Sequence, residues 1–184
     1  EKTTRLIAQM HKAITIIQFK LEGEIIRRRP EFEMDDRMLL HHIDLKRGVV
    51  HIDGKDYTLK DTNWPTLDPK DPYRLSIEEE DLIRKILHSF ESSEKMKKHM
   101  RCFFRHGGMY QVCNSNLLFH ASIPMNPDGT FKSVRILGQD YKGRALLDRV
   151  DQLIRTAYFK TGEQEEVEYA HDSVSYTHLT LPTT

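Results

Sequence analysis

The sequence has no excess of charge of either sign and no long apolar run. Lys and Arg together number 28, as do Asp and Glu, so the formal net charge is zero. A balanced chain has no overall field that would draw it to nucleic acid or to an anionic membrane surface. No apolar run approaches the roughly 18 residues that a membrane helix needs. We therefore expect a protein that binds neither nucleic acid nor membrane.

Cysteine is also scarce, and the familiar catalytic motifs are missing. Cys102 and Cys113 lack the C-x-x-C spacing of metal and redox sites, and small buried hydrophobes are the favoured interpretation of both. So few cysteines suit a reducing cytoplasm better than a disulfide scaffold. The sequence contains no HExxH, H-x-E or D-x-H motif, no phosphate-binding Gly-rich loop and no serine nucleophile elbow. Motifs alone therefore identify no complete catalytic site.

What the chain does contain is mainly helical patterning. Its 184 residues, 38% hydrophobic and 30% charged, fit one domain with a modest core. Apolar residues recur at near-helical spacing over 6–26 and predict a long helix with one broad buried face, ended by Pro30. Arg27, Arg28 and Arg29 follow the last apolar residues. Their positive charges stabilise the negative C-terminal end of the helix dipole, which is the favoured interpretation. Phosphate binding is the alternative.

Shorter elements are predicted next along the chain. Residues 35–43 predict a second helix, and residues 49–59 predict a small hairpin with an Asp-Gly type of turn. Three prolines in 61–75 are typical of a connector. Ser76 followed by Glu79 is a capping-box signature and predicts the start of a further helix.

The centre of the sequence is a pair of extended runs, 109–113 and 117–121, joined by a turn at Asn114. The second run is apolar almost throughout, as expected for a strand buried on both faces. It ends at His120, just before the turn at Pro124. Metal sites use histidines held in this way, because a neutral imidazole ligates through one nitrogen while the other is fixed by an acceptor. Spacing alone leaves two interpretations open, a structural histidine, which it favours, and a metal ligand.

The C-terminal part is predicted to contain a weaker strand at 131–137, an amphipathic helix over 146–158 and a polar surface segment at 160–168. Residues 174–184 can be back-translated as a frame of a transposon-end adapter used for sequencing libraries. We interpret this stretch as an artefact, expect it to be unpacked, and place the end of the natural sequence near Ser173. A genuine Thr-rich tail is the alternative.

Several blocks in order carry a family resemblance. They are HKAI at 11–14, IQFKLE at 17–22, IIRRRPEF at 25–32, SEKM at 93–96, GGMY at 107–110, NLLFH at 116–120, IP at 123–124, GR at 143–144 and LLD at 146–148. On these blocks the chain resembles the class III fructose-1,6-bisphosphatases of Firmicutes and related bacteria, from about residue 9 to Ser173. That family belongs to the calcineurin-like metallophosphoesterases, whose metal-binding histidine block is similar to residues 117–124.

The resemblance implies a fold and a division of the chain. We expect an α+β, mainly helical fragment with a short strand pair, which forms a slice of a four-layer α/β/β/α metallophosphoesterase fold. Residues 1–106 would be a helical segment with a small hairpin and a Pro-rich connector. Residues 107–173 would be part of the phosphoesterase core, and His106-Gly107-Gly108 is expected to be a helix-to-strand turn rather than a ligand block.

The resemblance also implies an activity, namely hydrolysis of fructose 1,6-bisphosphate to fructose 6-phosphate in gluconeogenesis. In such two-metal hydrolysis a bridging hydroxide attacks the 1-phosphate. Mn²⁺ is the implied ion of a binuclear site, and His120 is the implied metal ligand of this chain. The other ligands are expected outside it, so that the chain alone would be inactive. Arg105 and the arginines at 27–29 are basic candidates for phosphate contacts, and homo-oligomerisation is left open.

The sequence departs from the family where glycine is usual, at Ser115 and Ala121, and where cysteine is usual, at Ser122. Ala121 matters most, because a glycine after the ligand permits positive φ or a close approach to the metal. Two rival functions remain. One is another metallophosphoesterase, acting on proteins or nucleotides, and the other is a non-enzymatic helical module whose long first helix docks on a partner.

Overall fold

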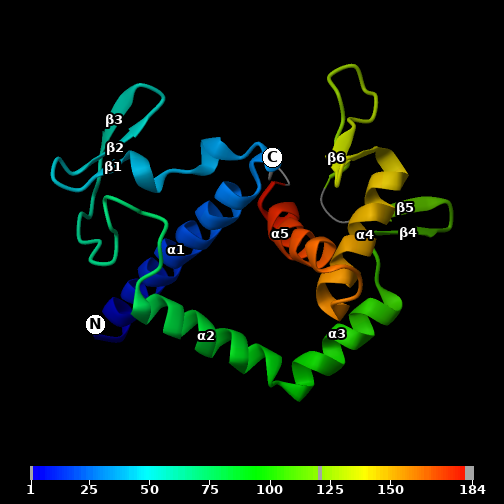
Figure 1. The fold of residues 1–184 in the computed structure, drawn as a ribbon, viewed down its shortest axis with the longest axis horizontal. Helices are drawn as coiled ribbons and strands as arrows, with labels where there is room; N and C mark the ends of the chain where they lie inside the picture. Colours follow the sequence, from blue (N-terminus) through cyan, green and yellow to red (C-terminus); the bar gives the residue numbers. More distant parts are fainter. Residues whose placement is uncertain (1, 120–121, 181–184) are drawn as a thin grey trace. The chain divides into compact units, whose positions relative to one another are not determined.

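The computed structural model describes residues 2–119 and 122–180 and has an α+β fold (Figure 1). The chain forms two compact units that divide between Ser92 and Ser93. This boundary precedes the one predicted after residue 106, so the helix at 94–106 belongs to the second unit. Within the described ranges, no helix is both long and apolar enough to cross a membrane.

The first unit contains two α-helices, three short 3₁₀ turns and a three-stranded antiparallel sheet with the strand order β1-β2-β3. In chain order these are α1 (Lys2–Arg28), η1 (Pro30–Phe32), η2 (Asp35–Arg37), η3 (Leu40–His42), β1 (Ile43–Asp44), β2 (Val49–Ile52), β3 (Lys55–Thr58) and α2 (Ile77–Glu91).

Helix α1 confirms the predicted long helix, but its buried face covers only part of its length. Ile16, Ile17 and Ile26 are buried, whereas every residue from 3 to 11 is exposed. The cover comes from the connector at 61–75 and the start of α2, which contact α1 from Lys12 onward. The prediction of one broad buried face along the whole helix is therefore wrong for its N-terminal half.

Two lysines of α1 form hydrogen bonds with the connector at 61–75. Lys12 donates to Asp61 at 2.5 Å, and Lys20 donates to the Thr66 carbonyl at 2.6 Å and to Glu79 Oε2 at 2.7 Å. Lys20 is fully buried. A buried ammonium needs such partners, because its charge would otherwise be desolvated without compensation.

Glu79 also completes the predicted capping box, which the structure confirms. Its carboxylate accepts from the Ser76 backbone N–H, and its own N–H donates to the Ser76 hydroxyl. Burial is the largest single influence and raises the pKa of Glu79, but hydrogen bonds from Lys20, Thr66 and Ser76 together lower that pKa below its ordinary value. The start of α2 is thus fixed by a carboxylate that also receives the buried lysine.

Tyr73 is the centre of the small core of this unit. It packs with Leu40 and Leu67, and its hydroxyl accepts a hydrogen bond from the Leu40 backbone N–H at 3.1 Å. That bond explains why residues 35–43 do not form the predicted helix: a helical Leu40 N–H would bond to the carbonyl four residues earlier. The structure has two 3₁₀ turns there instead.

The hairpin predicted at 49–59 is confirmed as β2 and β3, which pair from Ile52↔Lys55 to Val49↔Thr58. Its turn residues Asp53 and Gly54 both have positive φ, +50° and +74°, as a type I′ turn requires. Strand β1 adds a third strand that periodicity did not predict, because two residues are too few to show alternation.

Helix α1 approaches Tyr73 closely at Gly23. A Cβ added at Gly23 would lie 2.0 Å from Tyr73 Cδ1. In an exposed helix, Gly→Ala stabilises by about 1 kcal/mol. Here we expect Gly23→Ala to destabilise instead, by about 1–3 kcal/mol, because the ring has to move from a packed site. Urea unfolding of the two proteins checks this, and a raised midpoint for the variant would contradict the close packing.

In the part of the chain that the structure describes, the second unit contains three helices and two hairpins. They are α3 (Glu94–His106), β4 (Tyr110–Cys113), β5 (Asn116–Phe119), β6 (Val134–Ile136), β7 (Gln139–Tyr141), α4 (Gly143–Phe159) and α5 (Gln164–Thr180). The core lies between α4 and α5, where the buried apolar residues are Leu146, Leu147, Leu153, Ala157, Tyr169 and Ala170.

Helix α5 was not predicted, since residues 160–168 were expected to be a polar surface segment. The helix starts at Gln164 and buries Tyr169 and Ala170. It continues through Thr180, into the segment expected to be unpacked, and Val174 is half-buried. The side chains of 175–180 and all of 181–184 lie outside the described part, so their packing stays a prediction.

Candidate functional site

The strand pair that leads to His120 is an antiparallel hairpin, as predicted. β4 and β5 pair from Cys113↔Asn116 to Tyr110↔Phe119. The turn residues Asn114 and Ser115 have φ of +48° and +62°, in the left-handed region that favours glycine. This geometry would favour the glycine that the resemblance implies at 115.

The expectation that this strand is buried on both faces is wrong. Leu117, Leu118 and Phe119 are 48%, 55% and 43% exposed, and Val112 on β4 is 64% exposed. The reason is that the sheet has two strands among the described residues. An apolar run shows that a strand prefers burial, but it does not say what covers the strand.

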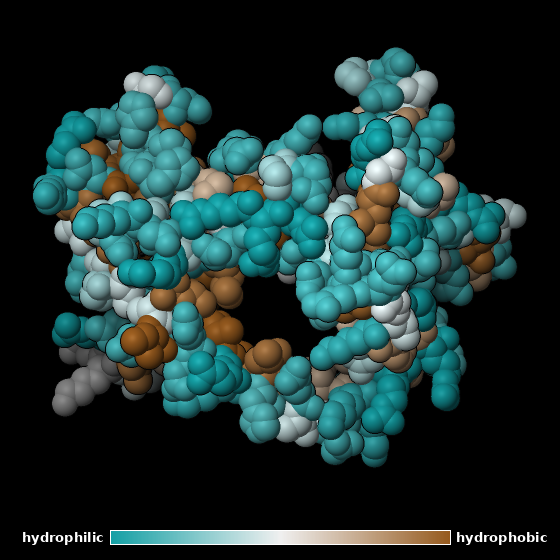
Figure 2. Space-filling view, in the orientation of Figure 1, coloured by the Kyte–Doolittle hydropathy of each residue, from teal (hydrophilic) through white to brown (hydrophobic). Residues whose placement is uncertain are grey.

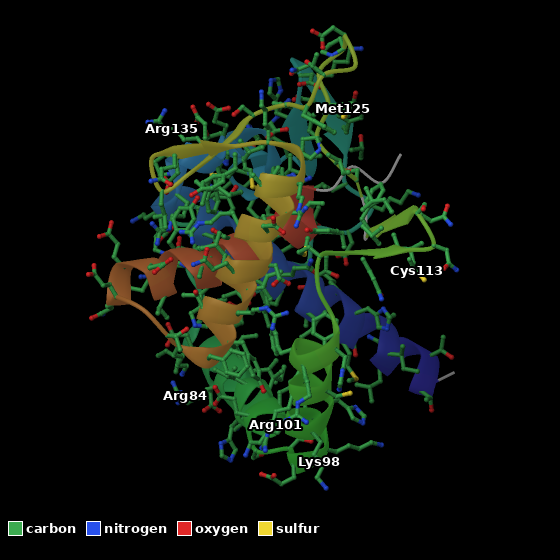
Figure 3. The ribbon with its side chains drawn as sticks, turned by 90° about the vertical axis from the view of Figure 1, so that its right-hand side faces the viewer. Arg84, Lys98, Arg101, Cys113, Met125 and Arg135 are labelled. Atoms are coloured by element: carbon green, nitrogen blue, oxygen red, sulfur yellow. The ribbon has the colours of Figure 1, made fainter. Side chains whose placement is uncertain are left out.

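The two cysteines are also exposed, contrary to their predicted role as buried hydrophobes. Cys113 lies at the outer end of the β4–β5 hairpin, and Lys98 and Arg101 point outward from α3 (Figure 3). The prediction is wrong for the same reason as for β5. Burial of the cysteines would need a further layer of structure, which the described residues do not contain.

The base of the hairpin is held by Arg155 of α4. Its guanidinium donates to the Phe104 carbonyl at 2.6 Å and to the Gly107 carbonyl at 3.0 Å, and it pairs with Asp151 at 2.7 Å. It therefore binds carbonyls at the C-terminal end of α3, where helix carbonyls lack intrahelical partners. Gly107 is the C-cap of α3, which confirms that residues 106–108 are a helix-to-strand turn.

We expect Arg155→Met to lower the free energy of unfolding of the second unit by about 1–3 kcal/mol, because the part-buried Phe104 carbonyl and the exposed Gly107 carbonyl lose a charged donor. Arg144→Met is the matched control, since Arg144 is 82% exposed at its side chain and its contacts are a 3.5 Å ion pair with Asp148 and a guanidinium 5.8 Å from the centre of the Tyr110 ring. The control is expected to change stability by less than about 0.5 kcal/mol. Urea unfolding measures both, and equal effects would contradict a special role for Arg155.

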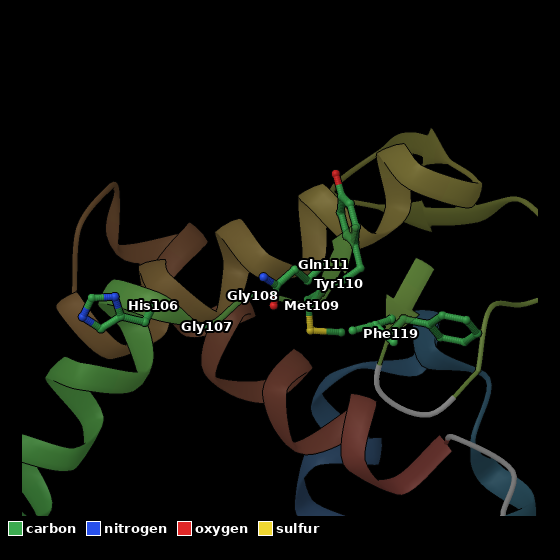
Figure 4. A pocket seen from close by; sticks show the side chains of 8 residues that line it. His106, Gly107, Gly108, Met109, Tyr110, Gln111 and Phe119 are labelled. Atoms are coloured by element: carbon green, nitrogen blue, oxygen red, sulfur yellow. The ribbon is translucent and has the colours of Figure 1, made fainter. Parts of the chain in front are cut away.

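A shallow hollow of about 540 Å³ lies beside the base of the hairpin (Figure 4). It is lined by His106, Gly107, Gly108, Met109, Tyr110, Gln111, Leu118 and Phe119. The Met109 side chain points toward Phe119, while His106 lies apart at the end of α3. The hollow offers one imidazole and no carboxylate, so its own side chains are not a metal site.

His120, the predicted metal ligand, and Ala121 lie outside the described residues. Among residues 2–119 and 122–180, no group of three or more His, Cys, Asp and Glu side chains is placed to hold a metal ion. The described residues therefore do not fit a binuclear centre by themselves. This result agrees with the expectation that most ligands come from elsewhere, but it does not test the role of His120.

The basic candidates for phosphate binding have different surroundings. Arg27 pairs with Glu24 at 3.1 Å and Asp71 at 2.9 Å, and its guanidinium lies 4.7 Å from the centre of the Tyr73 ring. Its charge is thus engaged within the first unit. Arg28 is exposed at the end of α1, and Arg29 lies 3.8 Å from Glu31. Arg105 is exposed near the end of α3. The described contacts favour a structural role for Arg27.

Comparison with known proteins identifies the family. The chain belongs to the Firmicute fructose-1,6-bisphosphatase family, whose model matches residues 1–180. The match is wider than the predicted 9–173 at both ends and extends into the segment interpreted as adapter.

Three similar curated proteins are named fructose-1,6-bisphosphatase class 3. One from Parabacteroides distasonis is 98% identical over 176 residues, 96% of this chain and 26% of the relative. One from Bacteroides fragilis is 64% identical with the same coverage, and one from Clostridioides difficile is 51% identical over 171 residues. The chain thus spans about a quarter of the length of these relatives. No solved structure matches it.

Proposed function

We propose that this chain is part of an enzyme that hydrolyses fructose 1,6-bisphosphate to fructose 6-phosphate and phosphate. The observation that carries the proposal is the 98% identity, over almost the whole chain, to a protein named fructose-1,6-bisphosphatase class 3. The substrate would be a small sugar bisphosphate, and gluconeogenesis in the cytoplasm would be the setting. Both follow from the family rather than from a site within the described residues.

We further propose that the complete enzyme is a metallophosphoesterase with a binuclear Mn²⁺ centre, to which this chain contributes His120. A divalent ion in such a centre neutralises charge on the phosphoryl group and activates water. The described residues do not form this centre, so its other ligands would come from polypeptide outside residues 1–184. This chain's part would be to hold one imidazole at the end of β5.

The exposed hairpin supports a place for this chain in a larger sheet. Leu117, Leu118 and Phe119 are open to solvent on β5, although the strand is apolar. In the complete enzyme these side chains would be covered by neighbouring layers, as the proposed α/β/β/α fold requires. Whether copies of the enzyme associate is a separate question, which size measurement of the complete protein answers.

A substrate panel tests the proposed function. The complete relative from Parabacteroides distasonis would be assayed against fructose 1,6-bisphosphate, phosphopeptides and dinucleotide polyphosphates, with Mn²⁺ present. We expect kcat/KM for the sugar bisphosphate to exceed the others by at least about 100-fold, since a site built for one substrate's hydroxyls rejects analogues strongly. Preference for a phosphopeptide or a dinucleotide would overturn the proposal and favour another phosphoesterase.

A further inference from the structure

Helix α1 carries a second apolar face that the described residues leave open. Leu6, Ile7, Met10 and Ile14 are 57%, 50%, 60% and 44% exposed. These four residues are here called the α1 stripe. Leu6 and Ile7 precede Met10 by four and three residues and Ile14 follows it by four, so they share one side of the helix. Apolar atoms lie open over α1 and α2 on the face of the first unit shown in Figure 2.

The side of α1 that carries the stripe is covered farther along the helix, since Ile17 is 3% exposed, but it is open over residues 6–14. At 100° per residue, Ile16, Lys20 and Gly23 lie on a side well away from Met10 and Ile14. Those three residues are buried. Lys12, which binds the connector, also lies on that packed side. Over residues 6–14, the described residues therefore leave the stripe uncovered.

The spacing of the stripe indicates that its occupant is a helix. Residues 7, 10, 14, 17 and 21 are Ile, Met, Ile, Ile and Leu, at the alternating intervals of three and four that suit helix-against-helix packing. Residues next to the stripe are mostly uncharged, including Thr4, His11 and Ala13. An apolar side of another helix would fit this surface better than a charged segment.

Two observations favour an occupant from the same polypeptide. Curated relatives are about four times as long as this chain, which covers 26% of them, so most of the polypeptide is outside the structure. The stripe itself is short, with four exposed side chains between residues 6 and 14. A stable dimer buries roughly 800 Å² on each partner, more than so short a patch provides. A segment of the same chain avoids the entropy cost of association, and a small patch then suffices.

We infer that the α1 stripe is the docking face for an amphipathic helix of the same polypeptide that lies outside residues 1–184. The docked helix would extend the buried surface of α1 to the N-terminal half. Helix α1 would then pack both against the first unit and against a helix from the rest of the enzyme.

Met10→Glu in the complete Parabacteroides distasonis relative tests the inference, with Gln9→Glu as the matched control. Both place one carboxylate on α1 at exposed positions, but only Met10 is in the stripe. We expect Met10→Glu to lower Tm by at least about 5 °C, because a charge is buried without a partner, and Gln9→Glu to shift it by less than about 1 °C. In the 184-residue chain neither should shift Tm appreciably.

Hydrogen exchange gives a second measurement that needs no variant. Amides of residues 3–14 are expected to exchange roughly 100-fold more slowly in the complete relative than in the 184-residue chain. Equal exchange in the two, or no effect of Met10→Glu on the complete protein, would overturn the inference. So would dissociation of an oligomer by Met10→Glu with the monomer's Tm unchanged, since the occupant would then be a second copy.

Discussion

Replacing the equivalent of His120 by alanine in the complete Parabacteroides distasonis relative is expected to lower kcat/KM for fructose 1,6-bisphosphate by at least about 100-fold. Loss of a residue that only orients a metal ligand typically costs 10–100-fold, so loss of a ligand itself should cost at least the upper value. The metal content of the purified protein, measured by elemental analysis, should fall together with the activity.

The matched control is His106→Ala at the end of α3. His106 is also followed by a small residue and lies near the same hairpin, but it is in a helix-to-strand turn. We expect this variant to keep its Mn²⁺ and nearly all of its activity. If His120→Ala retains both metal and activity, the assignment of His120 is wrong, whichever substrate the enzyme prefers.

Replacing Lys20 by methionine is expected to lower the free energy of unfolding of the first unit by about 3–5 kcal/mol. The Lys20 side chain is fully buried and the Glu79 side chain is 8% exposed, so the variant leaves a buried carboxylate without its cation. Methionine keeps the length and apolar character of the lysine stem. Urea unfolding, followed by helix circular dichroism, measures the difference.

Lys12→Met is the control on the same helix. Lys12 and Asp61 form a 2.5 Å ion pair with side chains 30% and 54% exposed, and such solvated pairs contribute less than about 1 kcal/mol. A loss for Lys20→Met no larger than that for Lys12→Met would contradict a stabilising buried pair.

The pH dependence provides a further check on the same pair. Because the pKa of Glu79 is lowered in the folded protein, its contribution is present above its ordinary value of about 4.5 and is lost as pH falls through the folded value. Lys20→Met should therefore weaken that acid dependence.

Local signals in the sequence predicted much of the fold. The capping box at Ser76, the hairpin at 49–59 and the turn at Asn114 each depend on neighbouring residues, and each was predicted correctly. Errors arose where distant residues decide the outcome. Leu40 bonds to Tyr73 rather than within a helix, and β5 lacks the layers that its apolar residues predict.

The sequence predicted less of the candidate site than of the fold. Spacing around His120 favoured a structural histidine, and only the ordered family blocks supported a metal ligand. The family itself is shown by the comparisons, whereas the role of His120 stays a prediction because it lies outside the described residues. The proposed binuclear centre would join ligands far apart in the polypeptide, and a chain that spans about a quarter of its relatives does not display their spacing.

The contacts of Arg155 have a mechanical consequence. One guanidinium joins the last turn of α3, the Gly107 carbonyl and Asp151 of α4. Any displacement of α4 is therefore transmitted to the residues that start β4, and through four residue pairs to β5. Substitutions deep in the α4–α5 core should therefore alter the position of β5, although they lie on other elements.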